Sequence, residues 1–496
     1  MEELKKALNE KGLKFSTLPE KGHCLFAARD FSPGEVIFSE NPYVCLPNKN
    51  KCEWCFSSTN LKKCSGCRVI WYCSSECQRS DWKLHSAECR VLSKVDKQRV
   101  NSLTPSLRLM VKLCVKRKLE IEKIIAMSPM MVDDFNATRL SLHLLQKVTS
   151  MWKRWFLVSF GNMSDINEKQ LLLYAQIANL VNLILPCPDF EINVKEITEN
   201  FSKVRFLDIP LVAEVTAGNL ACNAHTISDS ELRPHGTGLY PFISIINHSC
   251  LPNSVLVFEG RLAVVRAMQH IPKGTEVLIS YVDIAGSTLT RQKALKEQYY
   301  FTCACSRCIK LGQSDDIRES AVLEGYRCKD SQCDGFLLCD SDDKGFICQQ
   351  CGLLREKEEI TNITIKLKSM SEKASTLLSS GHKTEAIEAY KMIEGLQLQL
   401  YQPLSISLMR NRETLITVVC RVYPRSYPLV GLQYYMCGKF EWLLGETEAA
   451  VRSLTKALDI LRVTHGTKSP FMVELMNKVE EARAEALYKL HSQVVN

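Results

Sequence analysis

The residues that first suggest chemistry are cysteines and one histidine that recur in pairs between residues 52 and 89. The pairs are Cys52-x2-Cys55, Cys64-x2-Cys67, Cys73-x3-Cys77 and His85-x3-Cys89. A tight turn or one turn of helix brings both members of such a pair to the same ion, and four pairs supply enough ligands for two tetrahedral zinc ions. Every coordination position would then be filled, so we expect these ions to stabilise a fold and not to catalyse.

Two further cysteine clusters follow later in the chain. The first is Cys303-x-Cys305-x2-Cys308, for which Cys250 is the natural fourth ligand. With only three thiolates it would keep an open, catalytic position, and the spacing alone leaves both alternatives open. The second consists of the pairs Cys328-x4-Cys333 and Cys348-x2-Cys351, with Gly335 and Gly352 just after two of these cysteines. This pattern is typical of a zinc ribbon, although Cys339 also lies between the two pairs.

The cysteine count and the N-terminus bear on whether these thiols bind metal or form disulfides. The chain has 23 cysteines in 496 residues. Its first ten residues are charged and helix-forming and lack the apolar core of a secretory signal. We therefore expect a reducing compartment, in which cysteine pairs are more often zinc ligands than disulfides. No stretch is apolar and long enough for a membrane span, so we expect no membrane partner.

Composition and charge narrow the class of protein. With 46% hydrophobic and 24% charged residues the chain is an ordinary globular protein, long enough for about three domains. The net charge is +8, and residues 51–123 hold 16 Lys or Arg against 7 Asp or Glu, so the rest of the chain sums to −1. Such a basic region can favour nucleic acid or an acidic protein surface. A solvated face around a small metal module explains it at least as well, so nucleic acid is the less favoured partner.

Both strands and helices are expected to position these residues. The first fifty residues indicate short strands separated by turns, and Glu259-Gly260 suits the turn of a hairpin spanning 254–265. Helical periodicity dominates from about 90 to 200 and again after 355. Small residues on the last helices, including Ala389, Ala450 and Ala457, favour tetratricopeptide-like repeats, with a plain helical bundle as the alternative.

Several motifs in one order resemble a SET domain. They are Lys21-Gly22-His23, Asn247-His248-Ser249-Cys250-x-Pro252-Asn253, Gly274-x-Glu276-x4-Ser280-Tyr281 and Cys303-x-Cys305-x2-Cys308. The cluster at 52–89 has the ligand order of a MYND zinc finger, inserted where SET- and MYND-domain (SMYD) lysine methyltransferases carry it. The resemblance covers nearly the whole chain and looks closest to the plant branch of that family.

The resemblance implies an α+β protein with a β-rich, pseudoknotted SET domain that is split by the finger and a helical insert. A post-SET zinc site and an α-helical, tetratricopeptide-like C-terminal domain follow. The implied boundaries are SET parts at 1–50 and 216–282, MYND at 51–90, helical insert at 91–215, post-SET at 283–312, ribbon-like segment at 326–353 and helical domain at 355–496.

The resemblance also implies the ligand sets and the active site. The MYND pairs would interleave, with one zinc on Cys52, Cys55, Cys73 and Cys77 and another on Cys64, Cys67, His85 and Cys89. Cys250, Cys303, Cys305 and Cys308 would bind a third, and the ribbon cysteines are candidates for a fourth. Tyr281 would be the catalytic tyrosine, and S-adenosylmethionine would be bound by Lys21, Gly22, His23, Asn247, His248, Tyr299, Tyr300 and Phe301.

These implied roles make physical sense. Methyl transfer needs a neutral lysine amine aligned with the sulfonium methyl, so the site must desolvate the amine and fix its direction. A tyrosine hydroxyl and backbone carbonyls can orient the polarised methyl group, and aromatic faces suit the cationic sulfonium.

The implied function is an S-adenosylmethionine-dependent protein-lysine N-methyltransferase acting on histones, other proteins or both. The alternative is a non-catalytic scaffold that binds proline-rich peptides through MYND and partners through the helical repeat. We expect a monomeric chromatin regulator in the nucleus and cytoplasm, with a protein or histone-tail lysine as substrate. Two stretches, 143–161 and 204–220, depart from the family pattern as extra sequence, and 412–427 looks too short for the usual helix pair, which suggests an alternative transcript or imperfect gene prediction.

Overall fold

A computed structural model describes most of the chain. The described residues are 2–19, 21–95, scattered positions between 104 and 119, 223–299, 301–340, 344–380, 382–402, 405, 426–443 and 445–495. The stretches 143–161 and 204–220, most of the expected helical insert, and nearly all of 412–427 lie outside them. The described residues fall into two compact units, which divide between Asn247 and His248 and again around residues 252, 279, 297 and 301.

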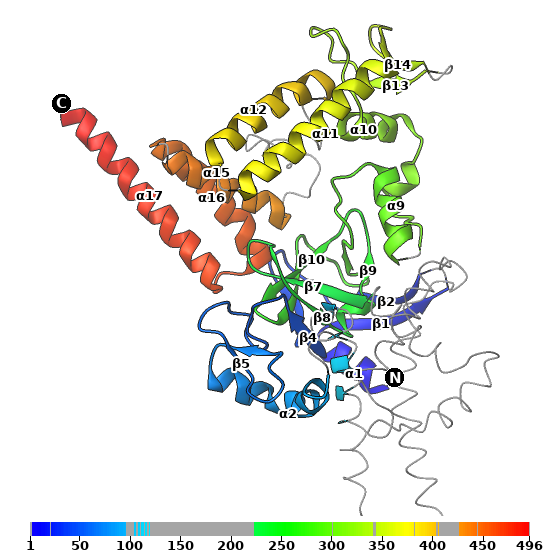
Figure 1. The fold of residues 1–496 in the computed structure, drawn as a ribbon. Coiled ribbons are helices and arrows are strands. Elements are labelled where there is room, and N and C mark those ends of the chain that lie inside the picture. Colours follow the sequence, from blue (N-terminus) through cyan, green and yellow to red (C-terminus); the bar gives the residue numbers. More distant parts are fainter. Residues whose placement is uncertain are drawn as a thin grey trace, which may run out of the picture. The chain divides into compact units, whose positions relative to one another are not determined.

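The first unit is rich in short strands (Figure 1). Its elements before the long insert are α1 (Glu2–Glu10), β1 (Leu13–Leu18), β2 (Gly22–Ala27), β3 (Val36–Glu40), β4 (Val44–Pro47), β5 (Lys62–Lys63), β6 (Trp71–Tyr72) and α2 (Ser75–Leu92). Those after it are β7 (Ala224–Ser228), β8 (Pro234–Leu239), the 3-10 helix η4 (Ile243–Ile245), β10 (Ser254–Glu259), β11 (Leu262–Ala267) and β12 (Leu278–Ile279), while β9 (Asn247–His248) spans the division.

Segments far apart in the sequence share the sheets of this unit. β3 pairs antiparallel with β11, which pairs with β10, and β4 pairs with β8, which pairs with β7. β1 and β2 form a separate antiparallel ladder. Strands from before the cysteine cluster therefore join strands from after the insert in common sheets, and the intervening chain is an insertion between them.

The β10–β11 hairpin forms where the turn residues predict it. Glu259 pairs with Leu262, so the two-residue loop is Gly260-Arg261, one position later than the expected centre. Gly260 has φ = 63°, a left-handed conformation that glycine adopts without the steric cost of a side chain. Buried Val264 and Val265 on β11 place this hairpin in the core of the unit.

The second unit is mainly helical, with a small sheet between α10 and α11 in the sequence (Figure 1). Its elements are α9 (Thr288–Tyr299, whose last two residues belong to the first unit), the 3-10 helix η5 (Cys308–Lys310), α10 (Ser314–Glu324), β13 (Leu337–Cys339), β14 (Gly345–Cys348), β15 (Leu354–Glu356), α11 (Lys357–Ser379), α12 (Lys383–Leu400), α15 (Pro428–Leu443), α16 (Thr447–His465) and α17 (Pro470–Val495). β15 ends at Glu356, so the helical region begins at Lys357.

Helix α15 packs closely on α16 because α15 carries glycines at the contact. A Cβ atom at Gly438 would lie 2.6 Å from Cγ of Leu454, and one at Gly431 would lie 2.5 Å from Cγ of Leu461. Both leucines are fully buried. Among the described helices none combines the length and apolarity needed to cross a bilayer.

Candidate active site and metal centres

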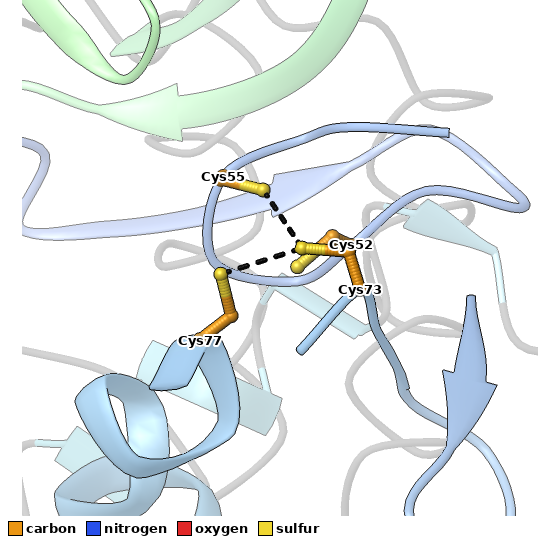
Figure 2. Close-up of side chains that lie close together, drawn as sticks. All are labelled: Cys52, Cys55, Cys73 and Cys77. Atoms are coloured by element: carbon orange, nitrogen blue, oxygen red, sulfur yellow. Dashed lines mark hydrogen bonds between the residues drawn. The ribbon is translucent and has the colours of Figure 1, made fainter. Parts of the chain in front are cut away.

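Four cysteines of the cysteine-rich finger (residues 52–92) point their sulfur atoms toward one another (Figure 2). Cys52 and Cys55 come from the loop after β4, Cys73 follows β6, and Cys77 lies in the first turn of α2. Sγ of Cys73 is 3.4 Å from that of Cys55 and 3.5 Å from that of Cys77, and all four lie within 4.8 Å of one another. Zn–S bonds of about 2.3 Å in a tetrahedron place sulfur atoms about 3.8 Å apart, so this group fits one zinc ion.

The second group of the finger consists of Cys64, Cys67, His85 and Cys89, whose ligand atoms also lie within 4.8 Å of one another. His85 and Cys89 lie four residues apart on one face of α2. Nε2 of His85 is 3.3 Å from Sγ of Cys64, which is 3.8 Å from Sγ of Cys89. The pairs therefore come together in the interleaved order that the MYND pattern implies.

A buried ion network lies behind these ligands, and the spacing of the cysteines gives no sign of it. The carboxylate of Glu53, 2% exposed, accepts hydrogen bonds from Arg108 (2.6 Å) and Lys112 (2.7 Å). Burial alone would raise the pKa of Glu53, but the two cations outweigh this and lower it to about 2. Glu88, also buried, lies 3.7 Å from both Arg108 and Nδ1 of His85. The network thus connects Arg108, a helical residue beyond the finger, through Glu88 to Nδ1 of His85, the ring nitrogen that faces away from the cysteines.

The third group joins Cys250 to the three cysteines of the 303–308 cluster. Sγ of Cys250 is 3.5 Å from that of Cys308, and the four sulfur atoms, with Cys303 and Cys305, lie within 4.8 Å of one another. Arg291, 1% exposed, donates to Sγ of Cys308 at 3.8 Å. A buried cation beside thiolates offsets their negative charge. With four sulfur ligands the tetrahedral coordination would be complete, so this geometry does not support the alternative of a three-thiolate site with an open position.

His248 connects this third group to Tyr281 within the second unit. The backbone N–H of Tyr281 donates to Nδ1 of His248 at 3.0 Å, and Nε2 of His248 lies 3.3 Å from Sγ of Cys250. Burial lowers the pKa of His248 to about 4, so the ring is neutral at pH 7. Because Nδ1 accepts, Nε2 carries the proton and donates to Sγ of Cys250. The cysteine cluster thereby fixes the backbone that carries Tyr281.

Asn247 is held by a second network, within the first unit. Its Nδ2 donates to the carbonyl of His23 and to Oε1 of Glu276, each at 2.9 Å. The other carboxylate oxygen of Glu276 accepts from Nζ of Lys21 at 2.8 Å. Glu276 lies in the expected motif, but the sequence suggested no role for it. It joins two predicted cofactor residues that are far apart in the chain.

The remaining predicted site residues are placed as follows. Gly22 has φ = 69° and begins β2. The ring of His23 lies edge-on to Phe15, and burial lowers the pKa of His23. Tyr299 ends α9 and, like Phe301, is half-buried and belongs to the same unit as Asn247. Tyr300 lies outside the described residues.

Comparison with known proteins places these observations in a family context. The SET domain model matches residues 22–282. The histone-lysine N-methyltransferase ASHR1 of Arabidopsis thaliana is 50% identical over 99% of both chains. The N-lysine methyltransferase SMYD2 of Bos taurus is 28% identical over 96% of this chain and 99% of its own, and that of Homo sapiens is 27% identical over 95% and 98%.

Proposed function

The chain belongs to the SET-domain family and is a lysine methyltransferase, as its motif series predicts, and we propose that it methylates histone lysines, other protein lysines or both with S-adenosylmethionine. The observation that carries the proposal is the hydrogen-bonded connection from Cys250 through His248 to the backbone of Tyr281. Such a connection fixes the backbone from which the tyrosine side chain extends, which a scaffold would not need.

S-adenosylmethionine, when bound, supplies an electrophilic sulfonium methyl group. Lys21 supplies donors that suit the carboxylate of its methionine end, and the amide oxygen of Asn247 suits its ammonium group, since both amide hydrogens of Asn247 already have acceptors. Tyr299 and Phe301 supply aromatic faces. Gly22 and His23 contribute backbone groups beside Asn247, and Tyr300 completes the proposed set with His248. Tyr281 directs its hydroxyl at the reacting centre, and the residues around it desolvate the substrate amine so that it loses its proton before attack.

We propose three zinc ions in this enzyme, two in a MYND finger and one in a post-SET site. The sulfur–sulfur separations near 3.5 Å in these groups support zinc because they match tetrahedral coordination. The domain boundaries implied by the resemblance, the pseudoknot and the tetratricopeptide-like character of the C-terminal helices are part of the same proposal. The name of the Arabidopsis relative favours a histone substrate and therefore a nuclear pool, and we propose a cytoplasmic pool for methylation of other proteins.

The test is a transfer assay with labelled S-adenosylmethionine, the full chain, and a panel of histones and other proteins. We expect labelled lysine in at least one substrate, and loss of label with Tyr281→Phe while cofactor binding is kept. Tyr488→Phe, at a position 75% exposed on α17, is the matched control and should transfer normally. Absence of both cofactor binding and transfer in the wild-type chain would favour the scaffold instead.

A further inference from the structure

A fourth group of thiols lies in the second unit, outside the three sites described above. Cys328, Cys333, Cys348 and Cys351 bring their Sγ atoms within 4.8 Å of one another. The separations are 3.5 Å between Cys328 and Cys351 and 3.6 Å between Cys333 and Cys348. A disulfide would need about 2.05 Å, whereas a tetrahedral zinc tetrathiolate places its sulfur atoms about 3.8 Å apart. The geometry fits a metal ion and not two disulfides.

The backbone around these cysteines is shaped for close approach of the sulfur atoms. The N–H of Gly335 donates to Sγ of Cys333 at 3.4 Å, and a Cβ atom on Gly335 would collide with Sγ of Cys348. Gly352 has φ = 73° and donates to the carbonyl of Cys348 at 3.0 Å. Glycine is therefore required at the first turn for space and favoured at the second for its backbone conformation.

Cys339, which also lies between the pairs, is not part of this group. It ends β13, where it pairs with Phe346 of β14, and its side chain is exposed. The three strands β13–β15 and the four clustered cysteines form a ribbon, residues 326–356.

The ribbon supplies hydrogen-bond donors to the C-terminal end of helix α12. The last four carbonyl groups of a helix have no partner within it. In α12, the carbonyl of Gln397 accepts from the N–H of Tyr401 at 2.8 Å, and the next three accept from the ribbon. Leu398 accepts from Nη1 of Arg327 (3.1 Å), Gln399 from Nη1 of Arg355 (2.9 Å), and Leu400 from the N–H of Arg327 (3.0 Å).

Charge and burial strengthen this cap. Arg355 is only 3% exposed and also donates to the carbonyl of Arg327 at 3.0 Å, so the two arginines are held in one arrangement. Guanidinium groups at a helix C-terminus interact favourably with its partial negative charge. A buried amide from Gln402, just beyond α12, donates back to the carbonyl of Gly335 at 2.9 Å. The turn that approaches the sulfur atoms is thus tied directly to the end of the helix.

An aromatic contact joins the same two parts. Tyr326 stacks on Tyr401 at 5.9 Å and meets Phe346 of β14 edge-on at 5.0 Å. Tyr326 and Phe346 contact both the cysteine cluster of the ribbon and the apolar core between α11 and α12. β15 also runs directly into α11, so the ribbon is continuous with one helix of the pair and caps the other.

We propose that the ribbon binds a fourth zinc ion through Cys328, Cys333, Cys348 and Cys351, and that this zinc holds the ribbon as the C-terminal cap of α12. A ribbon of this size buries little apolar surface alone, so zinc supplies much of the free energy that orders it. Loss of the ion therefore exposes the end of α12. This inference does not depend on the methyltransferase activity.

The test combines zinc stoichiometry with amide hydrogen exchange on the purified full chain. We expect four zinc ions per wild-type chain by native mass spectrometry and one fewer in the double variant Cys348→Ser, Cys351→Ser. Exchange in residues 397–402 of that variant should be at least about ten-fold faster. The matched control Cys339→Ser should keep the wild-type zinc count and exchange. A double variant with the wild-type zinc count would overturn the site.

A second variant separates the cap from the metal and remains informative if the cysteine variant fails to fold. Arg355→Met keeps all four thiols and should keep the wild-type zinc count, while exchange at the end of α12 becomes faster. Unchanged exchange there would overturn the capping role. A defect in the methyltransferase site would leave both readouts as they are, so failure of the two proposals can be told apart.

Discussion

At the scale of single residues, the carboxylate of Glu276 determines how two predicted cofactor residues are presented. Among the described residues, Oε1 of Glu276 accepts from Asn247 at 2.9 Å and Oε2 accepts from Lys21 at 2.8 Å. The side chain of Glu276 is 9% exposed whereas that of Lys21 is 54% exposed, so the buried carboxylate orients the exposed ammonium group. A carboxylate accepts at both positions, but an amide must turn its NH2 group toward one of the two donors.

Glu276→Gln should therefore weaken S-adenosylmethionine binding by about ten-fold, because a charge-assisted hydrogen bond is worth somewhat more than 1 kcal/mol. The dissociation constant, measured by calorimetry, is the direct readout. Glu259→Gln, which alters an exposed ion pair with Arg266, is the matched control and should bind normally. Equal cofactor affinity in Glu276→Gln and wild type would contradict the role.

Glu40 is a half-buried carboxyl group whose role is electrostatic. Burial raises its pKa to about 7, although the N–H groups of Phe242 and Ile243 and the charge of Lys11 act in the opposite direction. The N–H of Phe242 donates to both carboxylate oxygens, at 3.0 Å to Oε1 and 3.1 Å to Oε2, and the N–H of Ile243 donates to Oε2 at 3.0 Å. Because the folded state holds the proton more tightly than the unfolded state, this group makes the folded protein less stable as pH rises from about 4.5 to about 7.

Comparing wild type with Glu40→Gln isolates that contribution. The amide oxygen of glutamine can replace Oε2 as acceptor, but the side chain does not titrate. Wild type should lose up to about 3 kcal/mol of stability relative to the variant between pH 4.5 and 7, measured as the difference in denaturant midpoints. Parallel pH profiles for the two proteins would show that Glu40 is not responsible.

At the scale of elements, the closeness of α15 and α16 depends on glycine. Alanine normally stabilises a helix interior by up to about 1 kcal/mol relative to glycine. At Gly438, however, the added methyl group would lie 2.6 Å from Cγ of buried Leu454. Gly395 on α12 is exposed, and a Cβ atom there meets nothing within 4 Å.

Replacing glycine by alanine should consequently change the stability of the protein in opposite directions at Gly438 and Gly395. Gly438→Ala should destabilise the protein by about 1–3 kcal/mol through overpacking, whereas Gly395→Ala should stabilise it by about 0.5–1 kcal/mol. Thermal unfolding of both variants measures this. Stabilisation by Gly438→Ala would contradict the prediction, because it would mean that α15 and α16 can move apart without loss of folding free energy.

An element could be predicted from the sequence when the interactions that define it join residues close together in the chain. The hairpin at Gly260 depends on adjacent residues, and the cysteine pairs depend on spacings of a few residues, so both are visible in the sequence. Arg355 reaching the carbonyl of Gln399 spans 44 positions, and Lys21 reaching Glu276 spans 255. Such contacts form only when elements distant in the sequence pack against one another, so no local sequence pattern predicts them.

At the scale of the whole molecule, the match to the SET family confirms what the motifs predict because their order survives a long insertion. Strands on either side of the insertion pair with one another in the first unit, so the insertion leaves the sheets of that unit intact. The partners of buried Glu53 illustrate what the motifs leave out. Arg108 and Lys112 lie more than fifty positions away, in a region whose sequence shows only helical periodicity.

The zinc groups should therefore differ in their effects on catalysis. Cys308 shares its group with Cys250, which contacts His248 and through it Tyr281, so Cys308→Ser should disturb the backbone that carries the proposed catalytic tyrosine. Cys55 lies in the first unit, and its sulfur neighbours among the described residues are other ligands of the finger. We expect Cys308→Ser to lower kcat at least about ten-fold, and Cys55→Ser to change it by less than about three-fold per folded molecule. Each variant should lose one zinc ion, measured by mass spectrometry, and equal losses of kcat in both would show that the finger also supports Tyr281.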